Sequence, residues 1–143
     1  MKTVRQVLEG KKSGALSVAP GASVYDALKL MAEHDVGSLV VLDGDRLAGI
    51  FSERDYARKV VLMGRSSETT LVVEIMTANV ICVSPRTKSR DCMALMSEKN
   101  IRHLPVVDNG RVIGMVSVRD IVTDIIADQD FTISQLEQYI SGQ

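Results

Sequence analysis

Aromatic side chains are scarce in this chain, which has two Phe, three Tyr and no Trp among its 143 residues. Proteins that bind single-stranded nucleic acids stack the bases on such side chains. The formal net charge is −1, and no basic run offers attraction for a phosphate backbone. We therefore expect no nucleic-acid partner.

Long hydrophobic runs are missing too. No segment approaches the roughly eighteen consecutive apolar residues of a membrane-spanning helix. The opening stretch MKTVRQVLEGKKSG carries charges where a signal peptide is apolar. These absences predict a protein with no membrane contact and a cytoplasmic location.

Cysteine is limited to Cys82 and Cys92, which form no C-x-x-C pair. Hydrophobic residues make up 45% of the chain, so a core can form without a disulfide. Because free cysteines are among the most buried residue types, both are predicted to be buried thiols.

Catalytic motifs are absent as well. The sequence contains no G-x-S-x-G, H-E-x-x-H, P-loop or G-x-G-x-x-G motif, and no acidic cluster with metal-ligand spacing. The prediction is that the chain is not an enzyme and holds no metal.

What the chain does have is an internal repeat. The stretch GIFSERD at 49–55 returns as GMVSVRD at 114–120, and at this offset of 65 the residues 17–61 align with 82–126 without a gap. Fourteen of the 45 aligned pairs are identical, and most others exchange one apolar residue for another. Residues 4–8 also resemble 72–76. Two copies of one structural unit are predicted.

Each copy follows the same pattern of a short strand, a helix, a two-stranded hairpin and a second helix. The first helix of each copy closes at Asp35 or Asn100. The other predicted segments are strands 15–18, 39–42 and 47–51 with helix 53–63, and strands 80–83, 104–107 and 112–116 with helix 118–127. Because continuous apolar strands need cover on both faces, the copies should pack face to face about a pseudo-twofold axis.

A final helix is predicted from the start signal that begins at Asp130, with Ile133, Leu136 and Ile140 on one side. This stripe either packs on the rest of the chain or pairs with a second copy. We favour a homodimer, because symmetry completes a single stripe. The expected α+β chain divides into a leading helix and linker (1–16), repeat 1 (17–63), a linker and helix (64–79), repeat 2 (80–127) and a C-terminal helix (128–143).

The chain resembles a tandem pair of cystathionine-β-synthase (CBS) domains, a Bateman module of the stand-alone type. The stretches VGSLVVLDGDRLAGIFSERDYA and IRHLPVVDNGRVIGMVSVRDIV carry this resemblance. It implies two clefts between the repeats that bind adenosine-containing ligands: AMP, ADP, ATP, S-adenosylmethionine, or NAD as an effector. It also implies that in G-x-x-[ST]-x-x-D the hydroxyl contacts phosphate and the carboxylate holds the ribose. Those residues are Ser52 with Asp55, and Ser117 with Asp120.

Physical reasoning on these motifs is compatible with that ligand. A helix that begins at Ser52 or Ser117 exposes unpaired N–H groups that attract anions, and a carboxylate one turn later can accept from two neighbouring hydroxyls. Arg54 and Arg119 add a permanent cation beside each helix start. The alternative is that Ser-x-x-Asp is only a capping box, with the arginines solvated.

One difference between the copies predicts two unequal clefts. Gly37-Ser38 becomes Arg102-His103, and these positions should face the central cleft. There Arg102 would bind an oxyanion and His103 would respond to pH near neutrality, although a structural role for His103 stays open. From His34 we expect only a contact with the helix dipole. The apolar slot for the adenine base is assigned to the edges of the first strands, at Leu16, Ser17, Val18, Val80, Ile81 and Cys82, and Val36 and Ile101 should close it from the other side. Pro105 is a further candidate for the nucleotide site.

The sequence is compatible with two functions. In the first, an adenine nucleotide shifts the arrangement of the repeats and so regulates a dimer or an unidentified partner protein. In the second, the chain is a dimerisation or scaffold module that needs no ligand.

Overall fold

The computed structural model describes residues 2–11 and 15–141. Met1, positions 12–14 of the predicted linker and positions 142–143 of the predicted last helix lie outside the described residues. The elements are α1 (Val4–Glu9), β1 (Ser17–Val18), α2 (Val24–His34), β2 (Ser38–Asp43), β3 (Arg46–Ser52), α3 (Glu53–Tyr56), the π-helix η1 (Ala57–Val61), α4 (Val72–Ile75), α5 (Ser89–Lys99), β4 (His103–Asp108), β5 (Arg111–Ser117) and α6 (Val118–Ile140).

The two predicted hairpins are confirmed, and they have the same register. β2 pairs antiparallel with β3, and β4 pairs antiparallel with β5, each with one irregularity at the equivalent place. The helices before the hairpins end at Asp35 and Asn100, both in the left-handed conformation that favours short polar residues. The duplicated sequence therefore gives duplicated backbone geometry.

The first strand is where the copies differ. β1 pairs parallel with β2, and the amide of Val40 donates to the carbonyl of Leu16 over 3.0 Å. The equivalent of Val40 in the second copy is Pro105, which has no N–H to donate. The predicted strand 80–83 is therefore wrong, and a single bridge between Val83 and Val106 takes its place.

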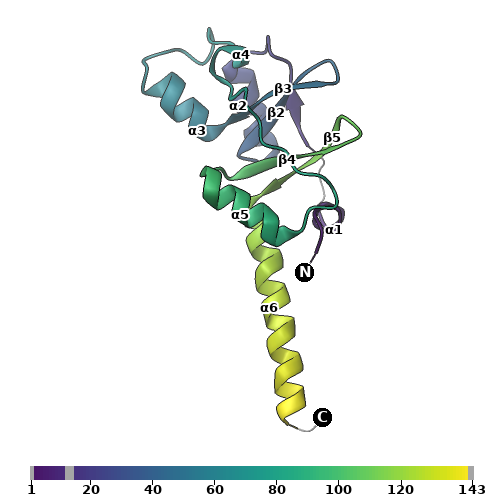
Figure 1. Cartoon of the computed structure of the whole chain (residues 1–143). Coiled ribbons are helices and arrows are strands. Elements are labelled where there is room, and N and C mark those ends of the chain that lie inside the picture. Colours follow the sequence, from purple (N-terminus) through teal and green to yellow (C-terminus); the bar gives the residue numbers. More distant parts are fainter. Residues whose placement is uncertain (1, 12–14, 142–143) are drawn as a thin grey trace.

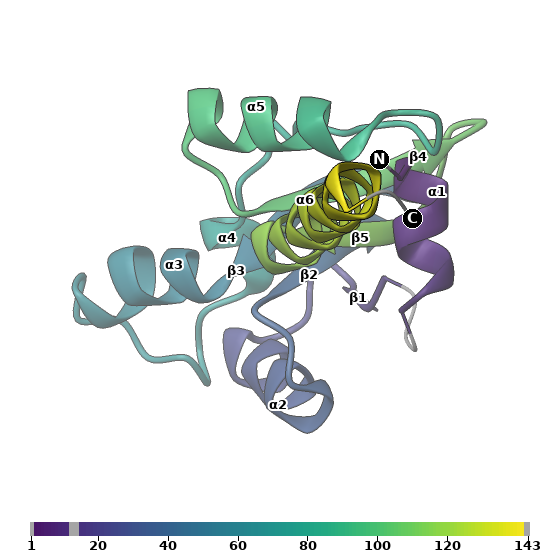
Figure 2. The same cartoon turned by 90° about the horizontal axis from the view of Figure 1, so that it is seen from below.

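The elements are layered with the hairpins in the middle. β3 contacts β5 where the copies meet, and Figures 1 and 2 show α2 and α5 on opposite sides of the hairpins. This arrangement confirms the α+β class and the packing of one copy against the other.

The short leading helices are exchanged between the two cores. α1 precedes the first copy in sequence, yet Val4 and Val7 are buried in the core of the second copy. α4 lies between the copies, and its Val72 and Ile75 complete the core of the first copy. Each core therefore depends on a helix from outside its own repeat.

Two predicted helices differ from the structure. Helix 118–127 and the predicted last helix are one continuous helix, α6, because 127–130 contain no Gly or Pro that would interrupt it. Thr132 donates its hydroxyl to the Asp128 carbonyl over 3.0 Å, an ordinary bond within a helix. The predicted helix 53–63 ends earlier, at Val61, and its second half is the π-helix, with a bond from the Leu62 amide to the Ala57 carbonyl.

The two cysteines have different environments. Cys92 is buried, and burial raises the pKa of its thiol to about 11. The prediction that Cys82 is buried is wrong, because it lies on an outward face, as does its equivalent Ser17.

Within the described residues, no helix combines the length and apolarity that crossing a bilayer requires. In the same ranges no group of three or more His, Cys, Asp or Glu side chains is arranged to hold a metal ion.

Candidate functional site

Two clefts lie between the repeats, one at the start of each second helix. The Ser117 cleft has a volume of about 750 Å³ and lies at the start of α6. The Ser52 cleft has a volume of about 470 Å³ and lies at the start of α3. Both volumes are in the range of small-molecule sites. Both clefts share the segment of Arg102 and His103, and Gly37 from the other repeat.

Most predicted site residues line these clefts. Those in the Ser117 cleft are Val36, Gly37, Ser38, Arg102, His103, Ser117, Arg119 and Asp120. Those in the Ser52 cleft are Gly37, Ser52, Arg54, Asp55, Ile101, Arg102 and His103. The duplicated motifs therefore reach separate clefts, while the segments that differ between copies stand between them.

Six of the predicted nucleotide-binding residues line neither of these clefts: Ser17, Val18, Val80, Ile81, Cys82 and Pro105. Val18 and Ile81 pack against the two hydrophobic cores instead. Of the predicted first-strand edge, Leu16 lines the Ser117 cleft, together with its neighbour Ala15.

The Ser52 motif forms a complete capping box. The Ser52 amide and hydroxyl each donate to Oδ2 of Asp55 over 3.0 Å, and the Asp55 amide donates back to the hydroxyl oxygen over 3.3 Å. Oδ1 of Asp55 accepts from the Thr77 hydroxyl over 3.2 Å and pairs with Nζ of Lys59 at 3.0 Å. This carboxylate is 6% exposed and held from several sides.

The Ser117 motif repeats the capping box with a different cation. The Ser117 amide donates to Oδ2 of Asp120 over 2.8 Å, and the Asp120 amide donates to the Ser117 hydroxyl oxygen over 3.2 Å. Nζ of Lys11 donates to the same Oδ2 over 2.8 Å and to the Met115 carbonyl over 2.9 Å. Both motifs therefore form capping boxes, and each box holds its carboxylate in place beside its cleft.

The cations differ because the repeats have diverged. Lys59 lies one turn after Asp55 on the same helix, but its equivalent in the second copy is Asp124. Lys11 compensates from the segment that follows α1. Burial acts to raise the pKa of Asp120, but the hydrogen bonds from Lys11 and Ser117 and the charge of Lys11 outweigh it and lower that pKa.

The wall between the clefts is built from residues of both copies. A side-chain carbon at Gly37 would lie 3.6 Å from Nε2 of His103, so these two segments are neighbours. Nη1 of Arg54 donates to the Asn100 carbonyl over 3.0 Å and links the copies. Burial lowers the pKa of His103; Lys11, Arg102 and Arg54 add to this, and Asp120 opposes it. The pKa of the imidazole therefore lies below its ordinary value, because its surroundings favour the neutral form.

Charge distinguishes the clefts. The Ser117 cleft is lined by the cations Lys11, Arg102 and Arg119, together with Asp35 and Asp120. The Ser52 cleft is lined by the cations Arg54 and Arg102, together with Glu53 and Asp55. The larger cleft also meets the start of the 23-residue α6, whereas the smaller meets α3, whose four residues continue into the five of η1. An anionic group therefore finds the more favourable field in the Ser117 cleft.

Several lining residues were not expected from the sequence. Lys11 and His34 line the Ser117 cleft, and Thr77 lines the Ser52 cleft. Lys11 and Thr77 each follow a leading helix, so the likeness of 4–8 to 72–76 was the available signal. The sequence assigns His34 only a dipole contact, and its place at the cleft follows from the turn at Asp35.

Comparisons with known proteins agree with the geometry. The CBS domain family matches residues 4–62 and 72–127. A mitochondrial CBS domain-containing protein of Arabidopsis thaliana, CBSX3, is 40% identical over 98% of this chain and 72% of its own length. The chain spans about a quarter of the length of other relatives from the same plant.

Solved structures share the fold. A CBS-domain protein of Burkholderia ambifaria MC40-6 is 52% identical, with a TM-score of 0.84 over 90% of this chain and 96% of that one. The CBS domain pair of MJ0100, solved with 5′-methylthioadenosine and S-adenosyl-L-methionine, is 25% identical, with a TM-score of 0.75 over 90% of this chain and 98% of that one. Two matched repeats, the shared fold and the paired clefts lead to one conclusion: the chain belongs to the CBS domain family, as a tandem pair.

Proposed function

We propose that this CBS-domain pair is a regulatory module that binds an adenine nucleotide, with the Ser117 cleft as the principal site. A CBS pair is a regulatory module rather than a catalytic one. The observation that carries the nucleotide proposal is that the two Ser-x-x-Asp motifs each line one inter-repeat cleft, with Arg102 and His103 between them. The adenosine ligands of the MJ0100 pair support the same ligand class.

Each part of the nucleotide has a counterpart in the Ser117 cleft. Phosphate oxygens would accept hydrogen bonds from Arg102, Arg119 and Lys11 and from the free N–H groups at the start of α6. The Asp120 carboxylate, fixed by the capping box, would accept from the ribose hydroxyls. Leu16 and Val36 offer apolar surface to the base. AMP, ADP, ATP and NAD share these parts. Binding would favour one arrangement of the repeats and thereby alter a dimer or a partner protein.

Calorimetric titration with AMP, ATP, NAD and S-adenosylmethionine tests this proposal. Asp120→Asn keeps an acceptor for the Ser117 amide but removes the charge. We expect it to weaken binding about ten- to a hundred-and-fifty-fold, the effect of losing one charged hydrogen bond. Asp55→Asn is the matched control and should have a smaller effect. Equal affinity in Asp120→Asn and the parent would refute the ribose assignment.

A thermal melt separates this function from a scaffold role. A nucleotide at a hundred times its dissociation constant adds about 2.7 kcal/mol to the free energy of unfolding, so the melting midpoint rises. An unchanged midpoint with all four ligands would identify a ligand-independent dimerisation module instead.

A further inference from the structure

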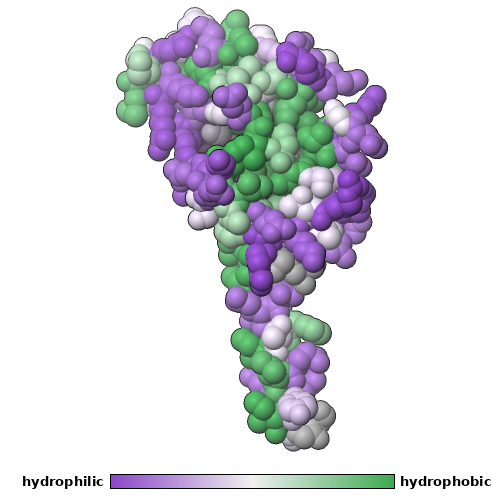
Figure 3. All heavy atoms as spheres, in the orientation of Figure 1, coloured by the Kyte–Doolittle hydropathy of each residue, from purple (hydrophilic) through white to green (hydrophobic). Residues whose placement is uncertain are grey.

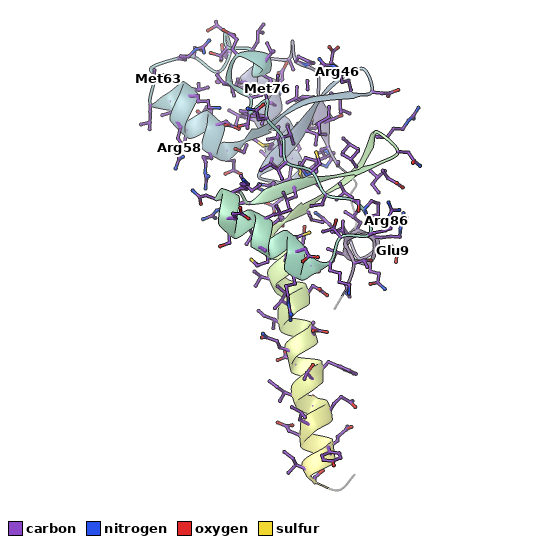
Figure 4. All side chains as sticks on the ribbon, viewed as in Figure 1. Glu9, Arg46, Arg58, Met63, Met76 and Arg86 are labelled. Carbon is purple, nitrogen blue, oxygen red and sulfur yellow. The ribbon has the colours of Figure 1, made fainter. Side chains whose placement is uncertain are left out.

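The far half of α6 projects from the body with a row of exposed apolar side chains. Figures 1 and 2 show the helix leaving the folded core, and Figure 3 shows hydrophobic atoms along one edge of the projecting part. In Figure 4 its side chains extend with no other element beside them. The exposed members of the row are Val122, Ile126, Ile133, Leu136 and Ile140.

The spacing of this row is that of a coiled coil. Together with Gln129, the residues follow each other at intervals of four and three, which is a heptad repeat. Ile126, Ile133 and Ile140 occupy position a. Val122, Gln129 and Leu136 occupy position d. We call these six residues the α6 seam.

A projecting helix of this composition needs a partner. Asp130, Thr132 and Ser134 are weak helix formers. A helix as short as the far half of α6 is only marginally stable in water when nothing packs against it. The capping box at Ser117 stabilises only the start of α6. Packing along the α6 seam is therefore the available source of stability for the far half.

We propose that the α6 seam pairs with the α6 seam of a second copy, in parallel and in register, as a two-stranded coiled coil. Ile at all three a positions, with Leu136 at a d position, is the combination that favours two parallel strands. In a parallel pair Gln129 meets Gln129 of the partner, and the two amides can bond. In an antiparallel pair with matched layers it would face Ile133 of the partner, leaving a polar group without a bond in an apolar layer.

The charges of α6 also favour a second copy in this direction. After Arg119 the sequence contains five acidic residues and no Lys, Arg or His. A helix that binds anionic lipid surfaces carries basic residues on its polar face, which excludes that occupant. Asp130 and Glu137 fall at position e, and in a parallel pair they lie beside position g, where Ile125, Thr132 and Tyr139 are uncharged. No like charges are brought together.

The first layer of the α6 seam reaches the ligand site. Val122 belongs to the seam and also lines the Ser117 cleft. A parallel pair therefore places the Ser117 clefts of both copies at the same end of the coiled coil. The pairing itself does not depend on whether the clefts bind a nucleotide.

Disulfide trapping tests the direction. Cys82→Ser removes the exposed native thiol, and Ile140→Cys or Gln138→Cys is then added. In a parallel pair the thiol of the Ile140→Cys variant faces the same thiol in the second copy. Near-complete cross-linking is then expected under mild oxidation. Gln138 lies on the opposite face of the same turn and is the control, which should cross-link slowly. In an antiparallel pair the residues at 140 lie roughly 27 Å apart, eighteen residues along the axis, so equal slow cross-linking of both variants would overturn the proposal.

Sedimentation over a concentration series tests the seam itself. The double variant Ile133→Glu with Leu136→Glu should raise the dimer dissociation constant at least about a hundred-fold, whereas Phe131→Glu, an exposed apolar residue off the seam, should leave it unchanged. Circular dichroism and the melt of the body check that the variants fold. A parent that stays monomeric, or a seam variant that dimerises like the parent, would overturn the proposal.

Discussion

Arg102 and His103 stand in the second copy where the first has Gly37-Ser38, and they lie in the wall that both clefts share. Gly37 leaves space for them, with His103 as its neighbour. Because both clefts contain this pair, it does not distinguish them. The difference in charge comes from Lys11, Asp35 and Arg119 in the Ser117 cleft and from Glu53 and Arg54 in the Ser52 cleft.

His103 predicts the pH dependence of stability. Its pKa in the folded protein is below the ordinary value, because burial and the nearby cations disfavour the imidazolium. As the pH falls through about 6.5 the unfolded chain takes up the proton first, so the free energy of unfolding should decrease. His103→Gln should flatten this decrease between pH 7 and 5.5 in denaturant titrations. His34→Gln is the matched control. An identical slope in His103→Gln and the parent would contradict the assignment.

The repeat itself led to the residues that line the clefts, while their contacts with a nucleotide stay a prediction. Ser52, Asp55, Ser117 and Asp120 were found because they recur at one offset. Lys11 lies outside the gap-free alignment, and the likeness of 4–8 to 72–76 indicates a leading helix before it without singling out the lysine. The adenine slot cannot be assigned from apolar sequence alone, since residues such as Val18 and Ile81 contribute to the cores as readily as to a cleft.

Within the elements, the strand glycines Gly49 and Gly114 make equivalent contacts with the two leading helices. A side-chain carbon at Gly49 would lie 2.7 Å from the Met76 sulfur and 2.8 Å from the Thr77 carbonyl oxygen. At Gly114 it would lie 2.7 Å from a terminal carbon of Leu8. Met76, labelled in Figure 4, and Leu8 occupy matched positions after the repeat alignment. Backbone stands in the way in the first copy, and a flexible side chain does so in the second.

This difference predicts unequal costs for one substitution. Gly49→Ala should destabilise the protein by about 1–3 kcal/mol, because the carbonyl cannot move aside without shifting the chain after α4. Gly114→Ala should cost less, because Leu8 can change rotamer and alanine fits a strand better than glycine. Chemical denaturation gives both free energies of unfolding. Equal losses would show that the leading helices are held equally loosely.

Two elements were predicted wrongly from sequence. In one, a single residue prevents the strand that the apolar pattern predicts, and in the other, no residue ends the preceding helix. Residues 80–83 have the apolar pattern of a strand, but Pro105 removes the donor that would have paired it. At Asp130 a start signal is present, yet a helix already under way continues, because nothing before it stops the chain.

At the scale of the whole molecule, each leading helix packs in a core that belongs to a different part of the chain. Val4 and Val72 are fully buried and hold equivalent places in opposite cores. Hydrophobic periodicity predicts that such helices exist. It does not predict which of the two cores each helix packs in, because the apolar residues of either core could cover it. The predicted cytoplasmic location likewise stays a prediction, because no feature of the fold reports a compartment.

Amide hydrogen exchange in two matched variants tests which core each leading helix stabilises. Val4→Ala and Val72→Ala should each cost about 1.5–3 kcal/mol of stability through lost burial and a cavity. In Val4→Ala the amides of β4 and β5 should lose protection first, although the mutation precedes the first copy. In Val72→Ala those of β2 and β3 should do so. Faster exchange in the hairpin nearest in sequence would contradict this pattern.

The crossing of the leading helices has a consequence for cutting the protein in two. A break anywhere in 64–71 would leave one fragment carrying α1, which the other fragment lacks, and a second fragment carrying α4, which the first lacks. Neither fragment alone contains all the residues of a hydrophobic core, whereas a mixture of the two fragments does. We therefore expect that a single repeat does not fold on its own, and that halves expressed separately regain structure only by complementing each other.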